Sequence, residues 1–239
     1  MHFQNQKTAS MANPGNKHSD DLEITESIGK AEGYVTENKK SITFIGGAIL
    51  VLILGYFGYT NLIVKPQEVN AQKEMYMAER YFQQDSVDKA INGDGQFPGF
   101  LEIIDNYGSS NSANLAHYYL GMSYLKKGEW DNAIEYLSKY DAEDDITGAL
   151  ALGAIGDANM ELGKKDEAEK FYMKAVDYDN NQFTAAIFLM KAALARELNN
   201  DYKGAADLYE RIKKDYPQST EARDIERYIV KAKNMAAKS

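Results

Sequence analysis

Hydrophobic and polar residues are arranged in three different ways along the chain, and each arrangement predicts a different element. Residues 1–40 are mostly polar and show apolar residues at helical spacing only over about 21–38. Residues 41–64 are apolar and carry no charged side chain. Residues 65–239 show apolar residues at helical spacing almost throughout. The pattern therefore predicts an all-α chain.

The helical spacing within residues 1–40 leaves two interpretations open. Ile24, Ile28 and Val35 fall on one helical face, which is typical of a short amphipathic helix lying at a membrane surface. Two glycines within the same stretch weaken such a helix. A loosely ordered linker therefore fits these residues equally well.

The apolar segment 41–64 is long enough to cross a membrane. As a helix it spans roughly 36 Å, against a hydrocarbon core of about 30 Å. A signal peptide has a shorter apolar region of about 7 to 15 residues close to the N-terminus, whereas forty residues precede this one. A core helix would carry a polar stripe, and this segment has none. We therefore predict one transmembrane helix over 41–64.

Lysines beside this segment predict its orientation. Lys39 and Lys40 directly precede it, and Lys65 alone directly follows it. Because cytoplasmic flanks carry an excess of Lys and Arg, the residues before the segment are predicted to form a cytoplasmic tail. In a wider window Lys30, Lys39 and Lys40 before the segment are balanced by Lys65, Lys73 and Arg80 after it. The predicted orientation therefore rests on the two nearest lysines.

Composition excludes several classes of function. The part after the apolar segment carries 22 Lys and Arg against 30 Asp and Glu. Nucleic-acid binding requires clustered basic residues, so no nucleic-acid partner is predicted. The chain has no cysteine, which excludes disulfide bonds, thiolate metal sites and a cysteine nucleophile. Neither observation selects a cellular compartment.

The helical part of the chain repeats itself. Three small residues recur after 35 residues, since Gly121, Gly128 and Ala133 return as Gly156, Gly163 and Ala168. A third copy places Ala205 a further 37 residues on, and a degenerate earlier copy covers 85–91. A period of this length indicates a repeat architecture.

These residues resemble the tetratricopeptide repeat, a helix-turn-helix unit of about 34 residues. The large positions of that repeat are matched by Leu120, Tyr124, Leu137, Tyr172 and Tyr209, and its closing proline by Pro217. The resemblance implies a solenoid of three to four helix-turn-helix repeats with a C-terminal helix that covers its open end. The expected repeats span about 66–108, 113–146, 148–181 and 184–217, and the capping helix spans 219–235, within a repeat domain of 65–239.

In this family the first helix of each repeat lines a concave groove that binds partners. By resemblance the groove positions here are Met75, Phe82, Leu115, Tyr118, Met122, Leu150, Met160, Ile187, Met190 and Leu194. They are mainly apolar and rich in methionine, which adapts to varied apolar segments. The alternative for each of them is packing against the next repeat or the capping helix.

The first repeat is interrupted by a loop at 92–99. Three glycines and one proline in these eight residues end a helix. Phe97 lies in this loop. It is predicted either to be presented to a partner or to be tucked into the repeat by a family-specific elbow.

Catalytic residues are scarce. His2 and His18 lie in the polar N-terminal part, and His117 occupies a repeat position where packing is the simpler role. The stretch 177–182 begins like a calcium loop but lacks the required glycine and glutamate. We therefore predict no enzymatic activity, no cofactor and no metal.

The layout of residues 22–239 resembles the YfgM-like ancillary subunits of the SecYEG translocon, and 92–107 resembles their Bacteroidetes-type branch. The resemblance implies a single-pass protein of the bacterial inner membrane with a periplasmic repeat domain. Its implied partners are the Sec translocon, a PpiD-like periplasmic chaperone, emerging chains and membrane lipid. A cytoplasmic-facing scaffold that recruits a soluble complex remains the alternative.

Overall fold

The computed structural model describes residues 34–238, which are helical or irregular and include no strand. The all-helical prediction is thereby confirmed for the described residues. The chain divides into two units, residues 1–60 and residues 61–239. The amphipathic helix expected over 21–38 lies outside the described residues except at its C-terminal end, where 34–37 are helical.

The first unit contains the apolar helix. Helix α2 (Lys39–Tyr59) has no buried residue, and a π-helical stretch, η1 (Thr60–Val64), follows it in sequence. The helical segment Lys39–Gln83 includes an 18-residue window with a mean hydropathy of 2.0, none of which is buried. By length and composition alone, this segment could cross a membrane.

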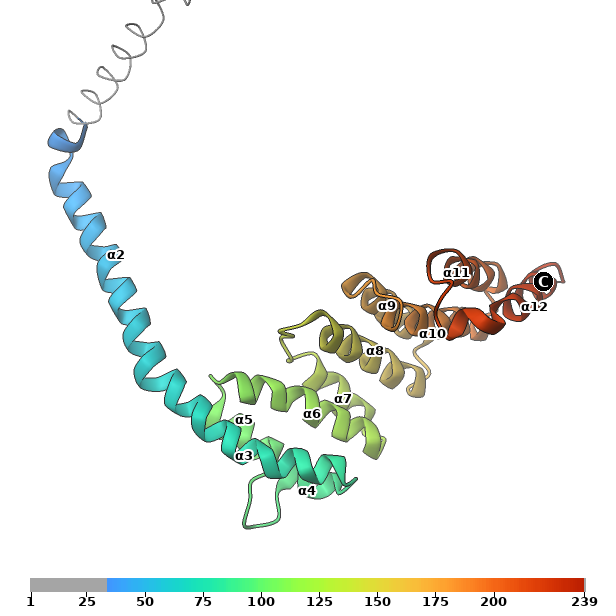
Figure 1. Cartoon of the computed structure of the whole chain (residues 1–239), viewed down its shortest axis with the longest axis horizontal. Coiled ribbons are helices and arrows are strands. Elements are labelled where there is room, and N and C mark those ends of the chain that lie inside the picture. Colours follow the sequence, from blue (N-terminus) through green and yellow to red (C-terminus); the bar gives the residue numbers. More distant parts are fainter. Residues whose placement is uncertain (1–33, 239) are drawn as a thin grey trace, which may run out of the picture. The chain divides into compact units, whose positions relative to one another are not determined.

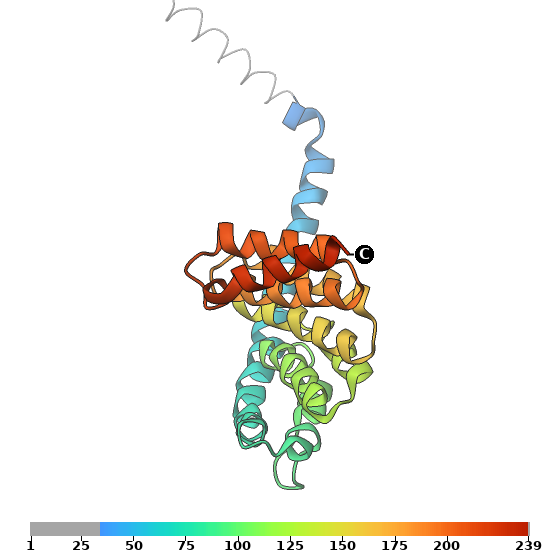
Figure 2. The same ribbon diagram turned by 90° about the vertical axis from the view of Figure 1, so that its right-hand side faces the viewer.

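The second unit is a succession of helices joined by short connections (Figure 1). The helices are α3 (Lys65–Gln83), α4 (Val87–Asn92), α5 (Phe100–Tyr107), α6 (Asn111–Lys127), α7 (Trp130–Leu137), α8 (Asp145–Glu161), α9 (Lys165–Tyr178), α10 (Thr184–Leu198), α11 (Tyr202–Asp215), the 3₁₀ turn η2 (Glu221–Asp224) and α12 (Ile225–Ala236). Figure 2 shows the later helices stacked in layers.

Four of these helices stand first in their repeats. They are α3, α6, α8 and α10, and each contacts the next one in this order. Their partners within the repeats are α4 with α5, α7, α9 and α11. The unit is therefore a solenoid in which the first helices form one continuous row.

Small residues allow the two helices of a repeat to approach closely. A Cβ atom added at Gly121 would lie 2.5 Å from Cγ of Leu137, and one added at Gly156 would lie 2.5 Å from Cε1 of Tyr172. These distances are too short for any larger residue to fit without a shift of the neighbouring side chain. The recurring glycines in the sequence thus mark helix contacts within the second and third repeats.

The loop between α4 and α5 is held by its own hydrogen bonds. The carboxylate of Asp94 accepts hydrogen bonds from the backbone N–H groups of Gln96 and Phe97, at 2.9 and 2.8 Å. The hydroxyl of Tyr81 donates a third, at 2.6 Å. Gly99 fits because a Cβ there would lie 2.3 Å from the carbonyl oxygen of Ile91. The loop therefore has a fixed conformation, in which Phe97 is 36% exposed.

The closing helix starts later than the sequence predicted. Ser219, the expected first residue, caps a 3₁₀ turn by accepting a hydrogen bond from the backbone N–H of Ala222, and α12 follows from Ile225. Ile225 and Ile229 are buried against the last repeat, at 2% and 4% exposure. The capping role is preserved, but a 3₁₀ turn forms its first part.

Three groups of buried apolar residues form the core. One lies among α3, α4, α5 and α6, around Phe100, Ile103 and Leu120. A large one extends from α8 to α12. Between them lies a small group, here called the joint cluster, which consists of Leu137, Ala151, Ala154 and Ile155.

Candidate functional site

The row of first helices carries the predicted groove residues. All ten predicted positions lie on α3, α6, α8 or α10. The partly or fully exposed side chains of these four helices are called the first-helix surface. Three of the predicted residues are clearly exposed, namely Leu150 at 40%, Ile187 at 41% and Leu194 at 39%.

Met75 is a correction to the sequence prediction. Its side chain is only 4% exposed and belongs to the core group of the first two repeats. Because α3 packs directly against α6, the side of α3 that carries Met75 is largely covered. Met75 stabilises the repeats and offers a partner almost no surface.

The other six predicted residues are half-buried and divide between the two interpretations. Phe82 and Leu115 pack beside the first core group, Tyr118 and Met122 beside the joint cluster, and Met160 and Met190 beside the last core group. Each therefore contributes to packing and retains some exposed area. These side chains form the floor of the first-helix surface.

Several exposed apolar residues on or beside these helices are absent from the predicted set, and two of them form a repeated pattern. Ile146 precedes Leu150 by one helical turn and is 54% exposed, and Phe183 precedes Ile187 by one turn and is 81% exposed. The two pairs are separated by 37 residues, so they occupy equivalent positions on neighbouring helices. We call these four residues and Leu194 the apolar half of the surface. The sequence contains this recurrence and could have revealed it. Ile146 and Phe183 were left out because they precede the positions that match the tetratricopeptide repeat.

A hollow lies at the other end of the surface. It measures about 680 Å³, and α3, α6, the connection after α7 and the start of α8 form its walls. We call it the acidic hollow. Its lining residues are Glu68, Gln72, Met75, Tyr76, Glu79, Asn111, Ser112, Asn114, Leu115, Tyr140, Glu143, Asp144 and Thr147. They include four carboxylates and no Lys, Arg or His.

The four carboxylates differ in their surroundings. Glu68 accepts hydrogen bonds from the backbone N–H and the hydroxyl of Ser112, and Asp144 caps α8 through Thr147. Within residues 34–238, the carboxylates of Glu79 and Glu143 have no hydrogen bond or ion pair. Burial raises the pKa of Glu79 above its usual value. Two acidic groups of the hollow therefore lack compensation by the protein.

A compensated charge pair lies beside the apolar half, because Lys191 stands between Ile187 and Leu194 on α10. Lys191 of α10 donates to both carboxylate oxygens of Asp157 in α8, each at 2.7 Å. The hydroxyl of Tyr172 donates to the same carboxylate, and burial, together with this bond, raises the pKa of the tyrosine. The pair ties α8 to α10 and leaves little net charge between the exposed apolar side chains.

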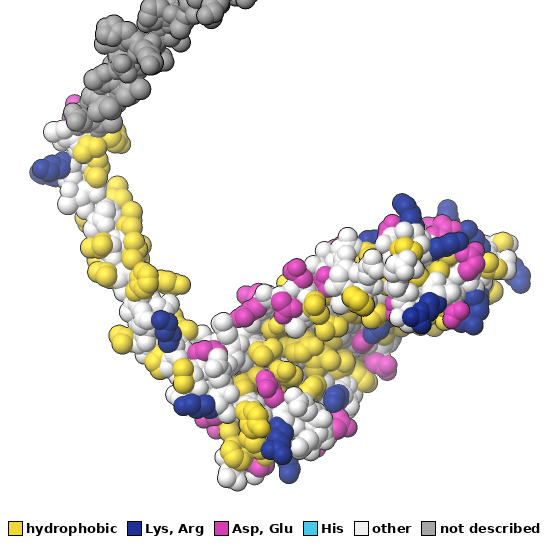
Figure 3. Space-filling model, viewed as in Figure 1, with side chains coloured by type: hydrophobic (Ala, Val, Ile, Leu, Met, Phe, Trp, Pro, Cys, Tyr) yellow, Lys and Arg dark blue, Asp and Glu magenta, His cyan; other side chains and the backbone are white. Residues whose placement is uncertain are grey.

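Figure 3 shows one face of the molecule, on which apolar side chains gather in the middle of the repeat unit around α6, α7 and α8. Acidic side chains border this area, and basic ones concentrate toward the C-terminal helices and the lower end of the unit. Charge and hydrophobicity are thus unevenly distributed along the repeats.

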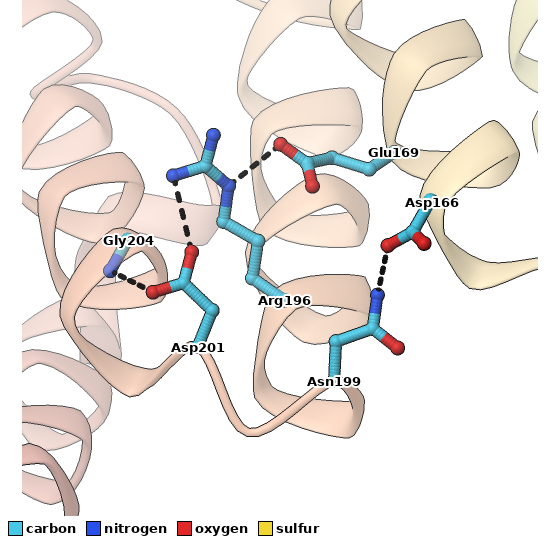
Figure 4. Close-up of polar contacts among 6 residues, drawn as sticks. All are labelled: Asp166, Glu169, Arg196, Asn199, Asp201 and Gly204. Carbon is cyan, nitrogen blue, oxygen red and sulfur yellow. Dashed lines mark hydrogen bonds and ion pairs between the residues drawn. The ribbon is translucent and has the colours of Figure 1, made fainter.

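A polar network positions α10 against the helices on either side of it (Figure 4). Arg196 donates through Nε to Glu169 of α9 at 2.6 Å and lies 3.6 Å from Asp201, which precedes α11. Asp201 also accepts a hydrogen bond from the backbone N–H of Gly204 at 2.9 Å. Asn199, at the C-terminal end of α10, donates to Asp166 in the first turn of α9. These contacts fix the helix that carries Ile187 and Leu194.

Metal-binding side chains do not gather among the described residues. No cluster of three or more His, Asp or Glu suited to a metal is present between residues 34 and 238. His117 is half-buried and stacks against Tyr136, and burial lowers its pKa. This environment agrees with a packing role for His117.

Comparison with known families identifies the repeats. Residues 115–143 and 188–219 match the tetratricopeptide repeat model. These two segments therefore resemble tetratricopeptide repeats. A TPR repeat-containing protein of Methanocaldococcus jannaschii is 28% identical over 123 residues, which make up 51% of this chain and 21% of that protein. The chain thus spans about one fifth of that relative's length.

Solved structures support the same fold. Two crystal structures of nearly identical TPR-like repeats, assigned to a kinesin light chain of Podosopora anserina, match with a TM-score of 0.53 at 14% identity. They cover 71% of this chain, which covers 87% and 88% of theirs. At this identity the likeness establishes a TPR-like solenoid. Tetratricopeptide repeats indicate a protein–protein interaction adaptor, and proteins of this type are typically non-catalytic scaffolds.

Proposed function

We propose that this protein is a membrane-anchored adaptor that binds polypeptide partners on its first-helix surface. The observation that carries the proposal is the exposed apolar half, in which equivalent positions of two successive repeats carry large apolar side chains. Exposed apolar residues gathered in one place are typical of protein interaction sites. Repeats of this family imply the same class of function.

Support for a membrane anchor comes from α2. Phe44, Leu52 and Leu54 are 78%, 73% and 62% exposed on this helix, and water would solvate such side chains unfavourably. A lipid environment would cover them. We accordingly propose that the apolar segment spans the bacterial inner membrane.

The finer proposal is an adaptor of the Sec translocon. It rests on the resemblance of the whole layout to YfgM-like subunits and on the lysines that favour a cytoplasmic N-terminus. The repeats would then lie in the periplasm and bind a PpiD-like chaperone or emerging chains.

Photo-crosslinking tests the binding surface and its partners. A photoreactive amino acid at Leu150 or Ile187, in the full-length protein in cells, should give adducts with a Sec subunit or the membrane-anchored chaperone. Val230 is 50% exposed on α12, outside the first-helix surface, and serves as the control position. Adducts with these partners at Val230 but not at Leu150 or Ile187 would move binding to another face.

Cysteine labelling tests the orientation. The natural chain has no cysteine, so Asn106→Cys and Ser10→Cys each introduce a single thiol. Asn106 is exposed on α5, so a thiol there is accessible to the reagent. In intact spheroplasts an impermeant maleimide should label residue 106 and not residue 10. The opposite result would exclude the periplasmic adaptor and favour the cytoplasmic-facing scaffold.

A further inference from the structure

The two ends of the first-helix surface differ in chemistry. Around α8 and α10 the exposed side chains are mostly apolar, and the Asp157–Lys191 pair is compensated. Around α3 and α6 the acidic hollow carries four carboxylates without a basic residue among its lining side chains. A partner that fits both ends needs two different kinds of side chain.

The two ends are continuous. Thr147, a lining residue of the acidic hollow, lies between Ile146 and Leu150 on the first turns of α8. Leu115 lines the hollow and occupies the position in the second repeat that Leu150 occupies in the third, 35 residues later. One chain segment can therefore contact the hollow and the apolar half together.

The acidic end lacks counter-charge. Glu79 is partly withdrawn from water, and among the described residues its carboxylate has no polar partner. A desolvated charge is costly unless a charge of opposite sign or hydrogen-bond donors approach it. A Lys or Arg side chain of a partner would supply both. Phosphate-bearing partners, whether nucleic acid or anionic lipid, would be repelled by the same carboxylates.

We propose that the first-helix surface recognises a polypeptide segment in which Lys or Arg residues stand beside a short apolar stretch. The basic end lies in the acidic hollow, and the apolar end lies on Leu150, Ile187 and Phe183. Neighbouring helices pack about 10 Å apart, so the path from α3 to α10 measures about 30 Å. An extended chain covers this distance with about nine residues. This inference rests on the proposed adaptor function and specifies its ligand.

Peptide binding to the full-length protein in nanodiscs of zwitterionic lipid tests the inference. The probe is a fluorescent peptide of about twelve residues with lysines at one end and leucines at the other. Two further peptides replace the lysines by glutamate or the leucines by serine. Fluorescence anisotropy gives the affinity of each peptide at low and high salt.

Three protein variants separate the contributions. Glu79→Gln with Glu143→Gln neutralises the two unpaired acids of the hollow. Leu150→Ser with Ile187→Ser removes apolar contacts at exposed positions, so the fold should be retained. Glu102→Gln with Asp207→Asn removes the same amount of charge from exposed positions on second helices, α5 and α11, and serves as the control.

We expect the hollow variant to bind the lysine–leucine peptide about tenfold more weakly, and the charge control to bind it as the natural protein does. The glutamate peptide should bind weakly to all proteins, and added salt should weaken only the charge-dependent part. If the apolar variant loses binding while the hollow variant keeps full affinity, the charge inference is overturned and the adaptor function stands. If neither variant alters the binding of any peptide, both are overturned.

Discussion

At the residue scale, Gly153 allows α8 to lie against α10. A Cβ atom added at this position would lie 1.9 Å from Cε1 of Phe188, whose ring is only 4% exposed. The ring has little room to move, because it belongs to the core group of the last repeats. The contact brings the helices of the apolar half together.

Gly153→Ala is expected to lower the free energy of unfolding by about 1–3 kcal/mol, because overpacking a buried contact outweighs the gain in helix propensity. Urea unfolding followed by circular dichroism measures the change. Gly55→Ala in α2 is the matched control, since nothing lies within 4 Å of its added Cβ. Combining Gly153→Ala with Phe188→Leu should recover part of the loss, and a loss that is merely additive would contradict the proposed contact.

Single residues also mark the limit of what the sequence could predict. The 35-residue recurrence of Gly121 as Gly156 correctly indicated close helix contacts, because only small residues fit there. Met75 was misplaced, since the sequence does not reveal how closely α6 covers α3. The missing counter-charge of Glu79 was equally inaccessible, because it depends on which side chains meet in three dimensions.

At the element scale, Asp94 organises the loop between α4 and α5. The hydrogen bond from Tyr81 and those from the backbone of Phe97 and Gln96 lower the pKa of Asp94 to about 2. A carboxyl group of this type in an unfolded chain titrates near pH 4. The stabilising effect of the carboxylate is therefore complete above about pH 4 and is lost as the pH falls from about 4 to 2.

We expect the backbone amide signals of Gln96 and Phe97 to titrate with a midpoint near pH 2 in nuclear magnetic resonance spectra of the full-length protein in micelles. Tyr81→Phe removes the first hydrogen bond and should raise the midpoint toward about 4. A midpoint near 4 in the natural protein would show that these hydrogen bonds do not form in solution.

The elements themselves were largely predictable. Glycine and proline spacing indicated the break between α4 and α5, and the repeat offsets indicated the helix pairs, which form a TPR-like solenoid. The start of the closing helix was misplaced, because Ser219 can cap a 3₁₀ turn as well as an α-helix and the sequence does not distinguish the two. Ile146 and Phe183 each lie one turn before a predicted groove residue. They were overlooked because the groove residues were chosen by matching positions of the tetratricopeptide repeat, and these two match none.

At the scale of the whole molecule, the repeats and the apolar segment call for different kinds of evidence. A solenoid is recognised from periodicity, because each repeat buries its neighbour's face. The side of the proposed membrane on which the repeats would lie is not encoded in that packing. It depends here on Lys39 and Lys40 against Lys65, so labelling of residues 106 and 10 carries the decision between the two adaptor models.

We expect the joint cluster to make the array compliant at the connection between α7 and α8. Two of its four residues, Ala151 and Ala154, are alanines, and a hollow of about 280 Å³ lined in part by Leu137 and Phe171 lies beside it. In a solenoid each interface contributes separately to stability. The array should therefore behave as two stiff segments joined by a compliant one.

When such an array is stretched from its ends in optical tweezers, we expect it to yield in two steps, with the first extension released at the connection between α7 and α8. A single cooperative step would show that the joint is as stiff as its neighbours. A partner held across α3 and α10 would bridge this compliant point, so tension on a bound chain would open the surface before it unfolded either segment.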